Sequence, residues 1–320
     1  MKALRKDFSA ELITKVYNTE RSIAKTAAVL STLGKGHVTR QRCRKWLLGL
    51  KLVAKPVKAT VAPTGPKVLL VDIETAPITA YVWSLWKQNV GLNQIKEEWN
   101  ILSYCAKWLG DPRIIYEDAR NDPADDEHLV RALWSLLDEA DIIIAQNGKR
   151  FDVPKIQARF VLLGLPPTSP FKVIDTLLMA RQQFNFTSNK LAWLTDKLCT
   201  DNKKSEHAKF PGFALWSECL KGNPEAWDEM REYNIPDVTS MEELYLILRP
   251  WYVGHPNVAI YNDSDEPACP KCASTNIKQD GWTFTQAGKY ERIHCGNCGG
   301  WSRGRYTRNS TAVRKAQLSN

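Results

Sequence analysis

Acidic side chains stand at three places where the sequence pattern predicts ordered structure. Asp72 and Glu74 lie in VLLVDIET, near the end of a continuous apolar run that is typical of a strand buried on both faces. Side chains two residues apart on a strand share a face, so both carboxylates point the same way. Asp152 follows a second buried strand, DIIIAQN. Asp237 lies four residues after Tyr233, which places both on one face of a helix.

Carboxylates at the ends of buried strands are costly unless cations neutralise them. Two divalent cations about 4 Å apart, held by such acids, are a standard arrangement for hydrolysing phosphodiester bonds. Mg²⁺, or Mn²⁺ in its place, suits this role because it takes few protein carboxylates and completes its shell with water and phosphate oxygens. Each acid taken alone also fits an ordinary turn or helix surface. The four together favour a nuclease.

The motifs around these acids occur in a recognisable order. They are VDIET, then N-x-x-x-F-D, then Y-x-x-x-D. This series resembles the three exonuclease motifs of the DEDD superfamily, the DnaQ-like 3′-5′ exonucleases with a ribonuclease H-like fold. The tyrosine of the third motif is similar to that of the DEDDy branch. The resemblance covers residues 68–252 and implies an α/β domain in which helices flank a mixed β-sheet.

The resemblance also implies roles for individual residues. Asp72, Glu74, Asp152 and Asp237 would hold the two metal ions, and Tyr233 would orient the attacking water. The positions that would lie beside the substrate are Ile73, Thr75, Asn147 and Phe151. Pro236 stands between Tyr233 and Asp237, and a proline inside a helix removes a hydrogen bond. We therefore expect the third motif's helix to start late or to bend there.

The eight cysteines fall into two sets. Four are scattered, at Cys43, Cys105, Cys199 and Cys219, and are predicted to be reduced thiols. The other four form two C-x-x-C pairs, Cys269 with Cys272 and Cys295 with Cys298, which flank a β-like stretch. This spacing predicts a zinc ribbon with one structural Zn²⁺, and redox chemistry is the weaker alternative. His294 is not needed as a ligand. The ribbon's basic and aromatic residues favour nucleic-acid contact, with protein docking as the alternative.

Residues 9–52 are predicted to be helical, and the last helix, RQRCRKWLLGL, is basic. The pattern resembles a helix-turn-helix, in which that helix lies in the major groove of DNA. This would direct Arg40, Gln41, Arg44 and Lys45 toward the nucleic acid. The alternative is a small three-helix domain with a solvated basic face. Lys203 and Lys204, which precede the third motif among aromatic residues, fit a groove for a single strand or, equally, a solvated surface.

The net charge of +9 is unevenly distributed, with +12 in residues 1–67, +4 in residues 261–320 and −7 between them. Basic ends around an acidic centre suggest arms that hold a polyanion and a core that holds cations. The expected organisation is a nucleic-acid-binding head at 1–52, a linker at 53–67, the nuclease domain at 68–252, the zinc ribbon at 257–302 and a basic tail at 303–320.

No apolar run in the sequence reaches the ~18 residues of a membrane span, and the N-terminus lacks the apolar centre of a signal peptide. We therefore expect a cytoplasmic protein, in the host cytoplasm if it is viral, that has no membrane partner. The leading hypothesis is a two-metal 3′-5′ exonuclease acting on single-stranded DNA or DNA 3′ ends. The alternatives are trimming of RNA 3′ ends, or a non-catalytic replication or regulatory adaptor. A proofreading role would require a polymerase or another replication protein as partner.

Overall fold

The structure, a computed structural model, describes residues 8–20, 23–33, 38, 40–50, 65–202 and 209–318. Contacts divide the chain into two units, Met1–Pro63 and Thr64–Asn320. The predicted linker lies, up to residue 64, outside the described residues, and so do Lys203 and Lys204. Within the described ranges, no helix has both the length and the apolar character that crossing a membrane requires.

Within its described residues, the first unit contains three helices: α1 (Ala10–Glu20), α2 (Ile23–Leu33) and α3 (Arg40–Gly49). The Ser9 hydroxyl accepts a hydrogen bond from the Leu12 amide at 3.2 Å, so Ser9 caps α1, a position that serine favours. Apolar side chains at helical spacing meet in one core, and they are Ile13, Val16, Ala27, Leu30, Val38, Cys43, Trp46 and Leu47. This core contains apolar side chains from all three helices, whereas Leu33 at the end of α2 is 60% exposed.

The second unit is built on a five-stranded sheet in the order β5-β4-β1-β6-β7. Its strands are β1 (Val68–Thr75), β4 (Ile101–Trp108), β5 (Ile115–Asp118), β6 (Ile142–Ala145) and β7 (Lys172–Asp175). β1 pairs antiparallel with β4 and parallel with β6. The sheet is therefore mixed, as the sequence predicts. A short ladder of β2 (Thr79–Ala80) and β3 (Ile95–Glu97), with the 3₁₀ turn η1 (Leu92–Gln94), interrupts the connection from β1 to β4.

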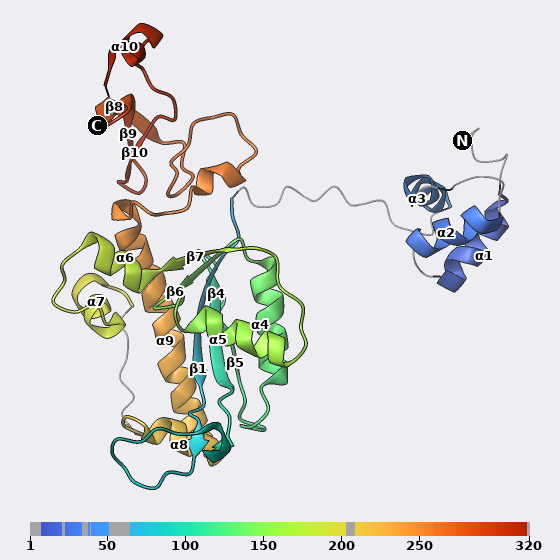
Figure 1. Ribbon diagram of the computed structural model, residues 1–320, viewed down its shortest axis with the longest axis vertical. Coiled ribbons are helices and arrows are strands. Elements are labelled where there is room, and N and C mark those ends of the chain that lie inside the picture. Colours follow the sequence, from blue (N-terminus) through green and yellow to red (C-terminus); the bar gives the residue numbers. More distant parts are fainter. Residues whose placement is uncertain are drawn as a thin grey trace. The chain divides into compact units, whose positions relative to one another are not determined.

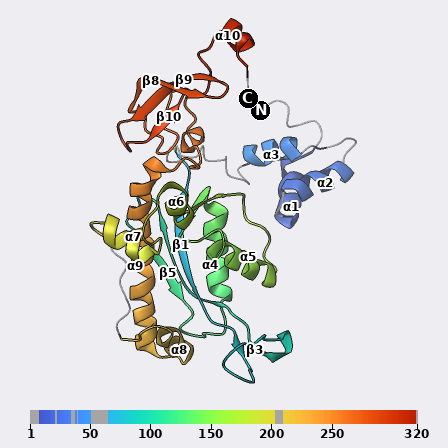
Figure 2. The same cartoon turned by 60° about the vertical axis from the view of Figure 1, so that its left-hand side comes forward.

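Helices cover both faces of this sheet, and Figures 1 and 2 show α4 and α9 on opposite sides of it. These helices are α4 (Glu127–Glu139), α5 (Asp152–Leu162), α6 (Thr176–Gln183), α7 (Leu191–Leu198), α8 (Ala214–Leu220) and α9 (Pro224–Leu248). One apolar core joins the sheet to α4 and α5, and the other joins it to α6, α7 and the C-terminal half of α9. This part of the second unit thus has the layered α/β architecture that the resemblance implies.

The alternation of side chains along β1 brings its acids to one particular face. Leu69, Val71 and Ile73 belong to the core shared with α4 and α5, whereas Leu70 belongs to the core shared with α9. Successive residues of a strand point to opposite faces, so Asp72 and Glu74 lie on the same face as Leu70. The two carboxylates therefore point toward helix α9.

Helix α9 is continuous from Pro224 to Leu248 and contains Pro236 in its interior. The helix does not start late, because it begins at Pro224, and tertiary contacts hold it on both sides of Pro236. Trp227 and Met230 are buried before the proline. Val238, Met241 and Leu244 are buried against the sheet. In addition, Lys107 of β4 forms a largely buried ion pair with Glu242. Packing of this extent outweighs the hydrogen bond that proline removes.

The C-terminal part of the second unit contains a three-stranded antiparallel sheet in the order β10-β9-β8. Its strands are β8 (Ile277–Thr285), β9 (Gly288–Cys295) and β10 (Trp301–Arg303), and helix α10 (Thr311–Ala316) follows them. Two 3₁₀ turns, η2 (Arg249–Trp251) and η3 (Val258–Tyr261), connect it to α9. The Lys271 ammonium donates to the Pro250 carbonyl, and the Val258 amide donates to the Pro270 carbonyl at 2.8 Å. These contacts attach the small sheet to the end of α9.

His255 lies at this junction and is the group from which we expect a pH effect on stability. Its Nδ1–H donates to the Pro256 carbonyl at 2.7 Å, and its Nε2 accepts from the Tyr245 hydroxyl at 2.9 Å. Burial, with the nearby positive charges of Arg249 and Lys271, lowers the pKa of His255 to about 4. The unfolded chain therefore binds this proton at a higher pH than the folded protein. The contribution of His255 to the free energy of unfolding is fully present above its ordinary pKa of about 6.5. This contribution is lost as the pH falls toward 4.

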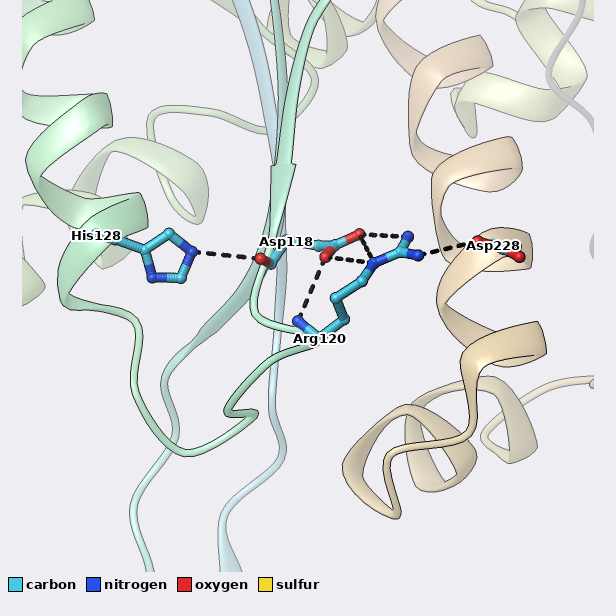
Figure 3. Close-up of polar contacts among 4 residues, drawn as sticks. All are labelled: Asp118, Arg120, His128 and Asp228. Carbon is cyan, nitrogen blue, oxygen red and sulfur yellow. Dashed lines mark hydrogen bonds and ion pairs between the residues drawn. The ribbon is translucent and has the colours of Figure 1, made fainter.

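Acidification from pH 6.5 to 4 is accordingly expected to lower the free energy of unfolding of the wild type by up to about 3 kcal/mol more than that of the His255→Phe variant. The measurement is urea unfolding of the second unit at a series of pH values. A matched control is His128→Phe, because His128 is exposed on α4 with its Nε2 3.3 Å from the Asp118 carbonyl (Figure 3). An identical pH dependence in wild type and His255→Phe would contradict the prediction.

Candidate active site

Three carboxylates from two elements converge on one point. Ligand oxygens of Asp72, Glu74 and Asp237 all lie within 4.8 Å of one another. The first two come from the α9-facing side of β1, and the third comes from the middle of α9 itself. Asp237 is 4% exposed, so its carboxylate has little access to solvent. The structure therefore brings together residues that lie about half the chain apart in sequence.

Asp152 is not a member of this three-carboxylate group, but it is linked to the same strand. It lies in the first turn of α5 and is 2% exposed. Its Oδ1 accepts a hydrogen bond from the backbone amide of Ile73, the residue between Asp72 and Glu74, at 3.3 Å. Burial raises the pKa of Asp152 to about 7, against the effect of the Ile73 hydrogen bond, and the nearby charge of Asp175 raises it further. A divalent cation bound beside it would favour the ionised form.

The loop between β6 and α5 places Asp152. Asn147 has a left-handed backbone with φ of 65°, and a Cβ on Gly148 would lie 2.4 Å from the Ala145 Cβ, so glycine is required there. The buried carboxylate of Asp175, at the end of β7, accepts hydrogen bonds from the Asn147 and Lys149 amides at 3.1 and 3.2 Å. The same carboxylate caps α6. Asp175 thus fixes the turn from which α5 begins.

Two side chains of α9 complete the surroundings of the acids. The Asn234 Nδ2 donates to Asp72 Oδ2 at 2.6 Å, and Asn234 is fully buried. Tyr233 is half-buried and packs edge-on against Trp216 of α8, with ring centroids 6.0 Å apart. Sequence reasoning identified Tyr233 but missed Asn234 and Asp175. Asp175 carried a usable signal, because it ends a buried strand in VIDT just as Asp72 lies near the end of one in VLLVDIET.

The remaining predicted residues lie in different environments. The side chain of Ile73 is 2% exposed in the core, and its backbone amide is the group that binds Asp152. Thr75 is half-buried, and Phe151 is 37% exposed, with the Lys155 ammonium 5.9 Å from its ring. Lys45 is exposed on α3. Arg40, Gln41 and Arg44 lie in the same helix, but their side chains are outside what the structure describes.

The donor set of the acidic group fits hard divalent cations. Like charges this close repel one another strongly, and water cannot screen a site that is partly buried. Cations remove this repulsion, and carboxylate oxygens are the ligands that Mg²⁺ and Mn²⁺ prefer. The hydrogen bond from Asn234 further restricts one of the three carboxylates in orientation.

A second cluster consists of sulfur atoms. The Sγ atoms of Cys269, Cys272, Cys295 and Cys298 lie within 4.8 Å of one another, with two separations of 3.7 and 3.6 Å. Four thiolates around a tetrahedral Zn²⁺, each with a bond of about 2.3 Å, would be about 3.8 Å apart. Each C-x-x-C pair is followed by a residue in the left-handed region, Ala273 or Gly299. Both pairs therefore form similar turns, whose geometry fits a single zinc ion.

A model of the RNase H superfamily matches residues 89–249, about half of the chain. The protein belongs to this superfamily, and its sheet and helices form an RNase H-like nuclease fold. No curated protein matches the chain. Among solved structures, the family B DNA polymerase from the hyperthermophilic archaeon Pyrobaculum calidifontis is similar over 58% of this chain, with 16% sequence identity and a TM-score of 0.42. The chain spans 25% of the length of that polymerase.

Proposed function

We propose that the protein is a metal-dependent 3′-5′ exonuclease of the DEDDy branch that hydrolyses phosphodiester bonds at DNA 3′ ends. The observation that carries this proposal is the convergence of Asp72, Glu74 and Asp237 within 4.8 Å on an RNase H-like sheet. Asp152 joins them through the Ile73 amide. These four acids are the ones that the motif order selects.

The four acids would together hold two Mg²⁺ or Mn²⁺ ions. Such ions supply activation of the attacking water and charge stabilisation of the leaving oxygen. Tyr233, one helical turn before Asp237, would hold the attacking water opposite the bond that breaks at the phosphate between the last two nucleotides. The water oxygen bonds to phosphorus, and the bond to the 3′ oxygen of the preceding nucleotide breaks. The products are a nucleoside 5′-monophosphate and a strand with a new 3′ hydroxyl.

Residues around the carboxylates would bind the substrate, and the other parts of the chain would have separate roles. Thr75, Asn147, Phe151 and the backbone of Ile73 would flank the terminal nucleotide. The four cysteines would hold one structural Zn²⁺ in a ribbon, and the N-terminal helices would contact nucleic acid through the basic side chains of α3. A polymerase or another replication protein would be the partner if the trimming is proofreading.

The test is degradation of a single-stranded DNA labelled at its 5′ end, with Mg²⁺ added back to protein dialysed free of it. We expect a ladder of products that shortens from the 3′ end. The same strand labelled at its 3′ end should release a labelled mononucleotide at once. Dialysis is preferable to a chelator, which would also remove Zn²⁺ from the thiolates. RNA of the same sequence serves as the comparison, and we expect it to be cut more slowly than the DNA.

Two outcomes would contradict the proposal. Products that shorten from the 5′ end, or internal fragments without a ladder, would exclude 3′-5′ exonuclease activity. DNA and RNA that both remain intact but are retained on a gel would favour the non-catalytic adaptor. Faster trimming of RNA would retain the chemistry and change the substrate.

A further inference from the structure

The three-stranded sheet of β8, β9 and β10 has two faces that carry different side chains. Trp301 pairs with His294, and Arg303 pairs with Arg292, across β10 and β9. Directly paired residues share a face, and so do residues two apart on one strand. One face, named here the arginine face, therefore carries Tyr290, Arg292, His294, Trp301 and Arg303. The opposite face carries Trp282, Phe284, Lys289 and Glu291.

Cations and rings on the arginine face are already stacked on one another. The Arg303 guanidinium lies over the Tyr290 ring at 4.3 Å, and the Arg292 guanidinium lies over the Trp301 ring at 5.0 Å. The His294 and Trp301 rings lie 4.6 Å apart. A guanidinium that stacks on a ring keeps its N–H donors at its edge, where a phosphate can accept them. The Nε–H of Arg292 already donates to the Asp280 carbonyl at 2.6 Å, so its terminal N–H groups are the ones that would meet a phosphate. The face is thus ordered before any ligand binds.

The charge of this region complements a polyanion. Residues 277–318 contain eight Lys or Arg and two Asp or Glu. The two acids have local partners: Glu291, on the opposite face, pairs with Arg308 at 2.5 Å, and Asp280 lies 3.6 Å from Arg292. Trp301 nevertheless remains 47% exposed. An exposed indole beside arginines offers stacking and phosphate pairing at one place.

We propose that the arginine face is a binding site for single-stranded nucleic acid. Unpaired bases stack on Trp301 and Tyr290, and Arg292 and Arg303 pair with the phosphates between them. A duplex fits less well, because its bases are already stacked on one another. The site contains no residue of the carboxylate group, so it goes beyond the proposed exonuclease activity and does not depend on it.

The test is fluorescence anisotropy of the full-length, zinc-loaded protein with labelled oligothymidine of about 20 nucleotides, without added Mg²⁺. Trp301→Ala is expected to raise Kd at least about ten-fold, and Trp301→Phe should restore most of the affinity because it restores a ring. Arg303→Gln should reduce the slope of log affinity against log salt by about 0.7, the value for one phosphate contact on a single strand.

The opposite face provides a matched control. There the Lys289 ammonium lies 4.2 Å from the Trp282 ring, so Trp282→Ala removes an equally placed indole from the same sheet. This variant should keep Kd within about two-fold of the wild type. Unchanged zinc content in every variant shows that the sheet is folded. Equal loss of affinity in Trp282→Ala, no loss in Trp301→Ala, or tighter binding of a duplex would each overturn the proposal.

Trimming of a trinucleotide separates this proposal from the proposed function. Such a substrate occupies the carboxylate site and is too short to depend on a second site. Wild type and Trp301→Ala should release its terminal nucleotide at the same rate. If neither protein trims it while their affinities for oligothymidine still differ, the exonuclease proposal fails and the proposed binding site on the arginine face is retained.

Discussion

Asp237→Asn is expected to lower the rate of 3′ nucleotide release by at least about 10³-fold, because the metal ions at such a site supply several kcal/mol of transition-state stabilisation. Asparagine keeps the shape of the side chain but removes a negative charge from a group whose ligand oxygens lie within 4.8 Å. The remaining carboxylates bind divalent cations more weakly. The measurements are single-turnover cleavage of 5′-labelled DNA and titration of the protein with Mn²⁺.

The same helix offers a matched control for this substitution. Asp228→Asn makes the same chemical change, at a side chain that is 69% exposed and whose ion pair with Arg120 spans 3.0 Å (Figure 3). An exposed ion pair contributes only about 0–1 kcal/mol, so this variant should cleave at the wild-type rate. In the metal-free protein Asp237→Asn should also melt no earlier than wild type, because it relieves repulsion between carboxylates. Wild-type cleavage by Asp237→Asn would exclude Asp237 as a ligand.

The grouping of three of the four carboxylates, and of the four cysteines, could be predicted from the sequence because each motif can be recognised within a few residues. The pair of acids lies near the end of an apolar strand, and each C-x-x-C pair spans four positions. The mixed sheet with flanking helices is what the resemblance of the acidic motifs to the exonuclease family implies, and the family match and the strand pairing confirm it. The convergence of Asp72, Glu74 and Asp237 depends on the face of β1 that α9 covers, and alternation along VLLVDIET already fixes which side chains share a face.

Other parts of the site depend on tertiary contacts that no short motif shows. Asn234 is important because its amide reaches Asp72, 162 residues away in sequence. Asp175 acts on Asn147 and Lys149 across the adjoining strand end. Local propensity at Pro236 predicted a late start or a bend, whereas the helix begins at Pro224 and the turns after the proline pack against the sheet. For Asn234 and Pro236 long-range packing, which no short motif shows, decides the outcome. For Asp175 the sequence shows an acid at the end of a buried strand but not the amides that it binds.

Cys295→Ser is expected to abolish zinc binding and to unfold the small C-terminal sheet. Structural Zn²⁺ contributes about 10–16 kcal/mol in isolated zinc modules at neutral pH, far more than so small a sheet gains from burial. Most side chains of β8, β9 and β10 are at least partly exposed, so the sheet has almost no apolar core of its own. The zinc content of the purified protein should fall from one ion per chain to none. Proteolysis should then cut within residues 269–303.

His294→Ala is the control that separates the loss of a zinc ligand from a change in the neighbouring residues. His294 adjoins Cys295 and carries a potential metal-binding nitrogen, yet its ring stacks on Trp301 and lies outside the four-sulfur group. This variant should retain one zinc ion. The trinucleotide assay should proceed in Cys295→Ser at close to the wild-type rate, because the carboxylates lie on β1, α5 and α9, whose apolar cores are formed almost entirely by residues outside the small C-terminal sheet. Loss of zinc in His294→Ala, or its retention in Cys295→Ser, would mean that the four thiolates are not the ligand set.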